Sequence, residues 1–168
     1  MHGGMVRLIT TLLMVVAAYL VASSARGETP VERGKYLVGI MDCTGCHTPG
    51  TMVGKPDPSR YLAGSDIGFE IPELGFFYPP NLTPDHATGI GAWSEQDIIT
   101  VLRTGTRPDG RELAPIMPWR SYATLSDEDI RAVAAYLKSL PPVEHAVPRL
   151  TGSSEKAPAP YFTVVVPK

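Results

Sequence analysis

The residues Cys43-Thr44-Gly45-Cys46-His47 restrict the fold of this 168-residue chain more than any other feature. They form the pattern C-x-x-C-H, in which two thiols can reach the two vinyl groups on one edge of a porphyrin and form thioethers, while the histidine lies under the iron. The chain has only these two cysteines, and a disulfide between them would close too short a loop to constrain a fold. The pattern predicts one covalent haem c, attached through Cys43 and Cys46, with His47 as an iron ligand.

Two other uses of this cysteine pair stay open as alternatives. A redox-active dithiol would be expected within a strand–helix–strand unit, which the flanking sequence does not resemble. Half a zinc site would need further ligands, but there is no third cysteine, and His86 and His145 are far apart in the sequence.

Residues 1–27 predict export from the cytoplasm. Arg7 precedes a long apolar run from Leu8 to Val21, and small residues follow as far as Ala25. This order is typical of a cleaved signal peptide. The alternative is a retained N-terminal anchor, although a membrane span needs about 20 apolar residues. Either way we expect a periplasmic protein, free or anchored to the inner membrane.

The charge of the remaining chain argues against nucleic acid as a partner. Removal of residues 1–27 takes away Arg7 and Arg26 and leaves 13 basic against 17 acidic residues, a net charge of −4. Proteins that bind nucleic acid carry a basic surface instead.

Three helices are expected, at 30–43, 95–104 and 127–140. Each follows a capping residue (Thr29, Ser94 and Ser126) and has apolar residues at helical spacing. No strand pattern of similar strength appears, so the predicted class is all-α. Such short helices bury little apolar surface alone, and a large apolar cofactor would complete the core.

The predicted organisation is therefore a domain at 28–142 and a Pro-rich, extended C-terminal tail at 143–168. The tail has two interpretations: a strap packed on the protein's own surface, or a segment that docks a partner.

A sixth iron ligand must come from outside the pentapeptide. Met117 is the preferred candidate, because it lies 70 residues downstream in a loop with prolines on both sides, which restrict its backbone. Met41 and Met52 are too close to the pentapeptide in sequence to reach the other haem face. His86, His145 or an open sixth position remain alternatives.

Several segments together resemble class I c-type cytochromes, and more closely the single-haem modules in cytochrome subunits of periplasmic and membrane-associated dehydrogenases. They extend over roughly residues 31–142 and include Arg33–Val38, Cys43–Pro49, Asn81–Asp85, Arg103–Gly105, Met117–Trp119 and Leu125–Ile130. The resemblance implies three to five short helices around one covalent haem, with a close contact between Gly34 and Tyr136 where the first and last helices meet.

The resemblance also implies roles for individual residues. The Pro80 carbonyl would accept a hydrogen bond from Nδ1–H of His47 and so orient that ligand. Trp93 and Arg103 would cover or bind the haem propionates. For Trp93 the alternative is core packing, and for Arg103 it is a favourable charge at a helix C-terminus.

The function implied is electron transfer rather than catalysis. Electrons would pass singly from a dehydrogenase toward an acceptor protein or oxidase of the respiratory chain. A diffusible shuttle with several partners, and a haem enzyme or gas sensor with an open sixth site, are the alternatives. This chain departs from the pattern in two ways: it has one module where such subunits often have three, and Pro80 lies 33 residues after His47.

Overall fold

The computed structural model describes residues 27–165 and 167. The predicted signal peptide or anchor falls, apart from Gly27, on residues outside this part of the chain. Within the described residues, no helix combines the length and the hydropathy needed to cross a lipid bilayer.

The first predicted helix is divided in two. Helix α2 (Pro30–Ile40) starts at the predicted cap Thr29, which forms a capping box with Glu32. A separate helix α3 (Cys43–His47) follows after a two-residue turn. Asp42 interrupts the helix because its backbone is left-handed, with φ of 52°. Its carboxylate then accepts a hydrogen bond from Gly45 N at 3.2 Å, which caps α3. The prediction of one helix over 30–43 was therefore wrong at its C-terminal end.

The other long helices agree with the sequence prediction. Helix α4 (Glu95–Thr104) has a capping box between Ser94 and Asp97 and ends at a left-handed Gly105. Helix α6 (Asp127–Ser139) is capped by Ser126. The short helix α5 (Trp119–Tyr122) and the 3-10 helices η1 (Thr51–Val53) and η2 (Pro58–Arg60) were not predicted. Most of the regular secondary structure in the described chain is thus helical.

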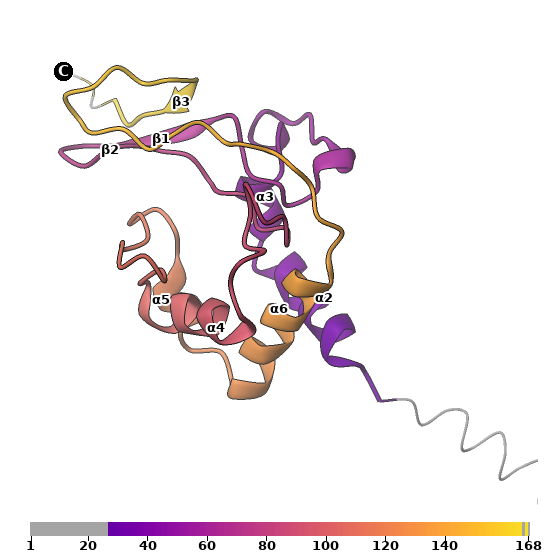
Figure 1. The fold of residues 1–168 in the computed structure, drawn as a ribbon. Helices are drawn as coiled ribbons and strands as arrows, with labels where there is room; N and C mark the ends of the chain where they lie inside the picture. Colours follow the sequence, from indigo (N-terminus) through magenta and orange to yellow (C-terminus); the bar gives the residue numbers. More distant parts are fainter. Residues whose placement is uncertain (1–26, 166, 168) are drawn as a thin grey trace, which may run out of the picture.

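Helices α2 and α6 cross closely and form the centre of the core (Figure 1). Leu37 and Val38 of α2 are buried in one cluster with Ile130 and Val133 of α6. Other apolar residues of α2 remain outside it, for example Ile40, which is 61% exposed. The core face of α2 is therefore narrower than its apolar sequence suggests.

Gly34 permits the close approach of these two helices. A methyl group at this position would overlap the carbonyl oxygen of Ala132 and lie 2.6 Å from Cβ of Tyr136. The implied contact between Gly34 and Tyr136 is thus present, and it depends on the absence of a side chain at Gly34.

A small sheet was missed by the all-α prediction, which is therefore only partly correct. Strand β1 (Gly68–Ile71) pairs antiparallel with β2 (Gly75–Phe77) and parallel with β3 (Tyr161–Phe162). The sheet lies at the end of the molecule away from α4 and α6 (Figure 1). Its strands are too short to show a clear alternation, and β3 comes from the tail.

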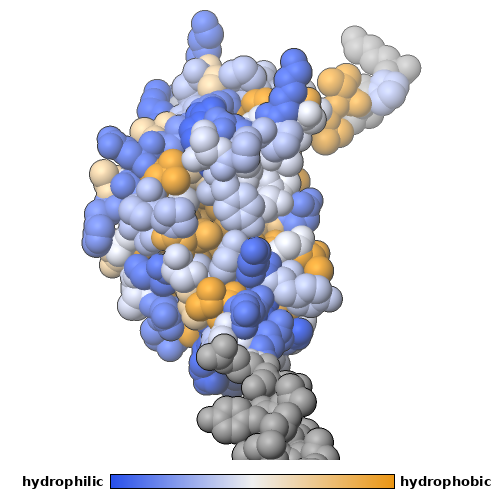
Figure 2. Space-filling model, turned by 90° about the vertical axis from the view of Figure 1, so that its right-hand side faces the viewer, coloured by the Kyte–Doolittle hydropathy of each residue, from blue (hydrophilic) through white to orange (hydrophobic). Residues whose placement is uncertain are grey.

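The C-terminal tail runs back along the domain as far as this sheet (Figure 1). Thr151 is buried and forms a β-bridge with Phe76. The ring centroids of Tyr161 and Phe76 lie 4.7 Å apart. Val164 beyond the sheet is 84% exposed. On the face shown in Figure 2, apolar side chains form small separate patches between polar ones.

The contact at Gly34 leads to a paired prediction. Gly34→Ala should lower the free energy of unfolding by roughly 1–3 kcal/mol, because the added methyl group must displace backbone of α6. Gly39→Ala, in the same helix, is the control: its methyl group would meet nothing within 4 Å and should stabilise by roughly 0.5–1 kcal/mol. Urea unfolding of both variants measures the difference. Equal effects would contradict the proposed packing.

Candidate functional site

The two cysteines lie one helical turn apart on α3. Positions three residues apart face the same side of a helix, so both thiols can reach the same cofactor. Cys43 is half-buried against the apolar core, whereas Cys46 is exposed, and both are free. Burial raises the pKa of the Cys43 thiol to about 11, and it also raises the pKa of Cys46. Both thiols are therefore neutral at physiological pH.

His47, at the end of α3, is buried and held in one orientation. Its Nδ1 lies 2.8 Å from the carbonyl oxygen of Pro80. A carbonyl can only accept, so Nδ1 carries the proton and Nε2 keeps its lone pair, which a metal ligand needs. Burial lowers the pKa of His47, and the Pro80 contact acts in the opposite direction. The imidazole of His47 is thus neutral, and the lone pair of Nε2 can bind a metal.

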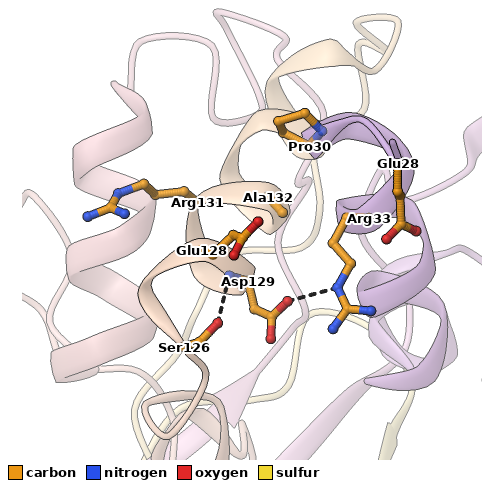
Figure 3. A pocket seen from close by; sticks show the side chains of 8 residues that line it. All are labelled: Glu28, Pro30, Arg33, Ser126, Glu128, Asp129, Arg131 and Ala132. Atoms are coloured by element: carbon orange, nitrogen blue, oxygen red, sulfur yellow. Dashed lines mark hydrogen bonds and ion pairs between the residues drawn. The ribbon is translucent and has the colours of Figure 1, made fainter. Parts of the chain in front are cut away.

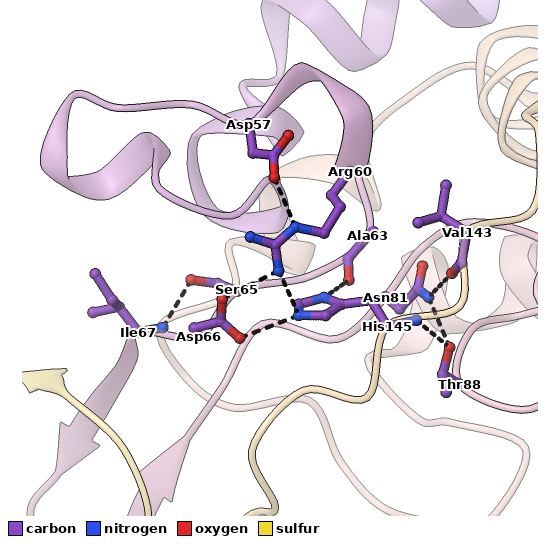
Figure 4. Close-up of polar contacts among 10 residues, drawn as sticks. All are labelled: Asp57, Arg60, Ala63, Ser65, Asp66, Ile67, Asn81, Thr88, Val143 and His145. Atoms are coloured by element: carbon purple, nitrogen blue, oxygen red, sulfur yellow. Dashed lines mark hydrogen bonds and ion pairs between the residues drawn. The ribbon is translucent and has the colours of Figure 1, made fainter.

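Asn81 fixes the backbone next to Pro80. This side chain is 1% exposed. Its Nδ2 donates to the Val143 carbonyl at 2.7 Å and to Thr88 Oγ1 at 3.1 Å, while Oδ1 accepts from Thr83 N at 2.9 Å. The contacts to Val143 and Thr88 are visible in Figure 4. The start of the C-terminal tail therefore supports the segment that orients His47.

Met117 is half-buried in a loop whose backbone is closely fixed. Its own N–H donates to the Ala114 carbonyl at 2.9 Å, and its carbonyl accepts from Trp119 N at 2.8 Å. Trp119 packs on Gly105, where a Cβ would collide with the indole ring. The sulfur of Met117 is therefore carried by an ordered segment between α4 and α5.

The two histidines considered as alternative ligands have other surroundings. His145 Nδ1 donates to the Ala63 carbonyl at 2.7 Å, and its Nε2 lies 3.1 Å from both Arg60 Nη1 and Asp66 Oδ1 (Figure 4). Both ring nitrogens thus already have polar partners, and only 12% of the side chain is exposed. His86 is exposed. Neither His145 nor His86 therefore has the surroundings expected of an axial iron ligand opposite His47.

A family comparison agrees with this geometry. The family model described as cytochrome c matches residues 31–141 of the chain. The chain belongs to the cytochrome c family.

Relatives of this cytochrome c include subunits of dehydrogenases. It is 37% identical over 124 residues to the cytochrome c subunit of the quinone alcohol dehydrogenase of Gluconobacter oxydans, covering 74% of this chain and 24% of that protein. It is 39% identical over 113 residues to the fructose dehydrogenase cytochrome subunit of Gluconobacter japonicus, covering 66% of this chain and 22% of that protein. It is 42% identical over 118 residues to a diheme cytochrome c-type of Cereibacter sphaeroides, covering 67% of this chain and 36% of that protein. The resemblance to dehydrogenase cytochrome subunits is confirmed, and this chain spans about a quarter of the length of the first two.

The residues of α3 fit the haem c that this family implies. They offer two neutral thiols on one helical face and a buried imidazole whose Nε2 is free. Tyr122 lies close by: burial, with a further contribution from Cys43, raises its pKa to about 12, and its hydroxyl donates to the Met41 carbonyl at 2.9 Å. Within the described residues, no three His, Cys, Asp or Glu side chains gather as a metal site.

Arg103 is bonded to groups of the protein at the junction of α4 and α6. Its Nη1 donates to the carbonyls of Ala123 and Leu125, and Nη2 lies 2.8 Å from Asp127 Oδ1. These bonds join the end of α4 to the start of α6. Three donor hydrogens of the guanidinium are thus used within the protein, and propionate binding by Arg103 stays a prediction.

Trp93 is half-buried and packs on the apolar core together with Cys43. The guanidinium lying over its ring belongs to Arg107, at 5.2 Å from the ring centroid. Sequence reasoning missed Arg107, since only the tertiary structure brings it to Trp93. Arg107 is half-buried, with 24% of its side chain exposed.

A polar hollow of about 750 Å³ lies elsewhere, between the starts of α2 and α6 (Figure 3). The ion pair of Arg33 and Asp129, at 2.8 Å, crosses it, and Glu28, Glu128 and Arg131 surround it. It contains none of the predicted haem residues. Its charged lining suits water rather than a porphyrin.

The cluster around His145 leads to a prediction on pH. Asp57 positions Arg60, and its bonds to Ser59 and Arg60 lower its pKa from 3.8 to about 2. Because the folded-state pKa is lowered, the carboxylate stabilises the fold above about pH 3.8 and loses this effect as the pH falls toward 2. Asp57→Asn should therefore lower the urea midpoint of the holoprotein at pH 7, and the difference from wild type should shrink below pH 4. A difference independent of pH would contradict this.

Proposed function

We propose that this cytochrome c holds one covalent haem c and passes single electrons from a dehydrogenase toward a respiratory acceptor, on the periplasmic side of the inner membrane. The observation that carries the proposal is His47, buried, oriented by Pro80 and preceded by two free thiols on one helical face. Bound haem iron would supply reversible one-electron chemistry.

The surroundings of the thiols support exchange with a protein rather than with a small substrate. Cys46 is exposed, whereas Cys43 packs on the core, so the haem edge held by this pair would lie at the surface. A redox partner can approach an exposed edge through a small, transient contact. The similarity to cytochrome subunits of alcohol and fructose dehydrogenases supports a dehydrogenase as that partner.

We propose Met117 as the sixth ligand. Its loop is ordered and its side chain half-buried, while His145 is bonded elsewhere and His86 is exposed. A thioether ligand opposite histidine favours reduced iron and raises the reduction potential. With both axial positions filled, small molecules could not reach the iron, which argues against a gas sensor or haem enzyme.

Replacing Met117 tests this ligand. Met117→Ala should lower the midpoint potential by ~60 mV or more, the value for a tenfold change in a one-electron equilibrium. The reduced variant should also bind carbon monoxide, which the wild type should not. Met52→Ala is the control, since Met52 lies in η1, close in sequence to the pentapeptide. A Met117→Ala protein with the spectrum and potential of the wild type would disprove the assignment.

Isolation from the native host tests the partner and the location. We expect the tagged, red protein to be recovered from the periplasmic or membrane fraction in a fixed ratio with a dehydrogenase subunit. Addition of that enzyme's substrate should then reduce the haem, seen as the ferrous absorption bands. A red cytochrome that elutes alone would favour the diffusible shuttle. A colourless protein without covalent haem would contradict the proposal itself.

A further inference from the structure

A short stretch of backbone, residues 62–65, lies between the two chain segments that meet at the His47 ring, and we call it the linking segment. Gly64 N donates to the carbonyl of His47 at 2.8 Å, and Ser65 N donates to the Pro79 carbonyl at 3.0 Å. The linking segment is therefore bonded to the histidine on one side and, on the other, to the segment that supplies the orienting carbonyl.

Leu62 has an unusual backbone conformation within the linking segment. Its φ is 57°, in the left-handed region that a bulky side chain rarely adopts, and its side chain is fully buried. Its N–H donates to Thr48 Oγ1 at 3.0 Å, and its carbonyl accepts from Leu82 N at 2.8 Å. Such a conformation persists only where the surrounding structure holds it, so the linking segment depends on its contacts.

His145 of the C-terminal tail makes one of these contacts (Figure 4). Its Nδ1 donates to the carbonyl of Ala63 at 2.7 Å, and Ala63 is itself buried in the middle of the linking segment. Only 12% of the His145 side chain is exposed. This bond joins the tail directly to the linking segment.

The other nitrogen of the His145 ring is held as well. Nε2 lies 3.1 Å from both Arg60 Nη1 and Asp66 Oδ1. Since Nδ1 carries the proton, Nε2 of the neutral ring accepts from Arg60, which is in turn fixed by Asp57 at 2.8 Å. The ring is thus fixed at both nitrogens, which a side chain that only fills space does not require.

The backbone of the tail next to this ring contacts the other segment. His145 N donates to Thr88 Oγ1 at 2.9 Å, and the Val143 carbonyl accepts from Asn81 Nδ2 at 2.7 Å. Residues 143–145 are therefore bonded both to the linking segment and to the segment that supplies the orienting carbonyl.

We propose that His145 is a positioning residue for the iron ligand His47. Its bond to Ala63 holds the linking segment and so keeps the Pro80 carbonyl within bonding distance of the ligand's ring. This inference rests on the proposed function, since an effect on iron requires covalent haem. A hydrogen bond from Nδ1–H makes an imidazole a more basic ligand, and a more basic ligand stabilises ferric iron. Loss of the support from His145 weakens this bond and moves the equilibrium toward ferrous iron.

Two substitutions distinguish the two nitrogens of His145. In His145→Asn the amide nitrogen is bonded to Cγ, as Nδ1 is, and can still donate to Ala63. In His145→Gln the amide lies one bond further out, in the place of Nε2, and the bond to Ala63 is lost.

The His47 ring proton and the midpoint potential of the holoprotein are the two readouts. In reduced His145→Gln, proton NMR should show Nδ1–H of His47 exchanging with deuterium about tenfold faster than in wild type, as expected when one supporting hydrogen bond is lost. The ferrous form should be favoured about threefold, a rise of ~28 mV at 59 mV per tenfold change. His145→Asn should restore most of both values.

Tyr161→Ser is the control in the same tail. It removes a ring whose centroid lies 4.7 Å from that of Phe76, so it should lower the urea midpoint without changing the exchange of Nδ1–H of His47 or the potential. Equal exchange rates and potentials in His145→Gln and His145→Asn, or in His145→Gln and wild type, would overturn the role of His145 while the covalent haem spectrum remained intact. Absence of covalent haem from the wild type would instead refute the proposed function.

A measurement on the wild type needs no variant to fold. If the tail and the iron ligand open as one unit, the backbone N–H of His145 and Nδ1–H of His47 should show the same dependence of exchange on urea. Exchange of the His145 N–H through a separate opening that leaves Nδ1–H of His47 protected would contradict the proposal.

Discussion

The hydrogen bond from His47 to the Pro80 carbonyl is the contact on which the arrangement of this cytochrome depends. It fixes the proton on Nδ1, leaves Nε2 free and sets the plane of a buried ring. A backbone carbonyl can do this only if the chain around it is rigid. The segment after Pro80 therefore has to be held by contacts from elsewhere, and these contacts explain much of the surrounding structure.

Asn81 supplies that rigidity through a buried set of hydrogen bonds. It ties the segment after Pro80 to Thr83, Thr88 and the Val143 carbonyl, and the last of these belongs to the C-terminal tail. His145 anchors the same part of the tail to the Ala63 carbonyl. The start of the tail thus helps to hold the segment that orients His47. A buried amide with several partners is costly to disrupt, since each orphaned group would lose its bond.

The long segment between His47 and Pro80 has a structural role, because it supplies the strands with which the tail pairs. It forms η1, η2 and the hairpin of β1 and β2, and the tail returns to pair with this hairpin. The sheet and the tail thus stabilise each other between residues as distant in the sequence as Gly68 and Tyr161. Such non-local pairing closes a long loop, which the helical domain makes possible by fixing both ends.

The sequence by itself determined the parts that depend on neighbouring residues. The pentapeptide at 43–47, the capping boxes of α2 and α4, and the extent of α6 are readable because spacing and capping act over a few positions. Only the tertiary structure decided the sheet, the path of the tail, and the placement of Arg107 rather than Arg103 beside Trp93. Arginines four residues apart look equivalent in sequence. Their partners, Asp127 for one and the Trp93 ring for the other, come from distant segments, which only the folded chain brings together.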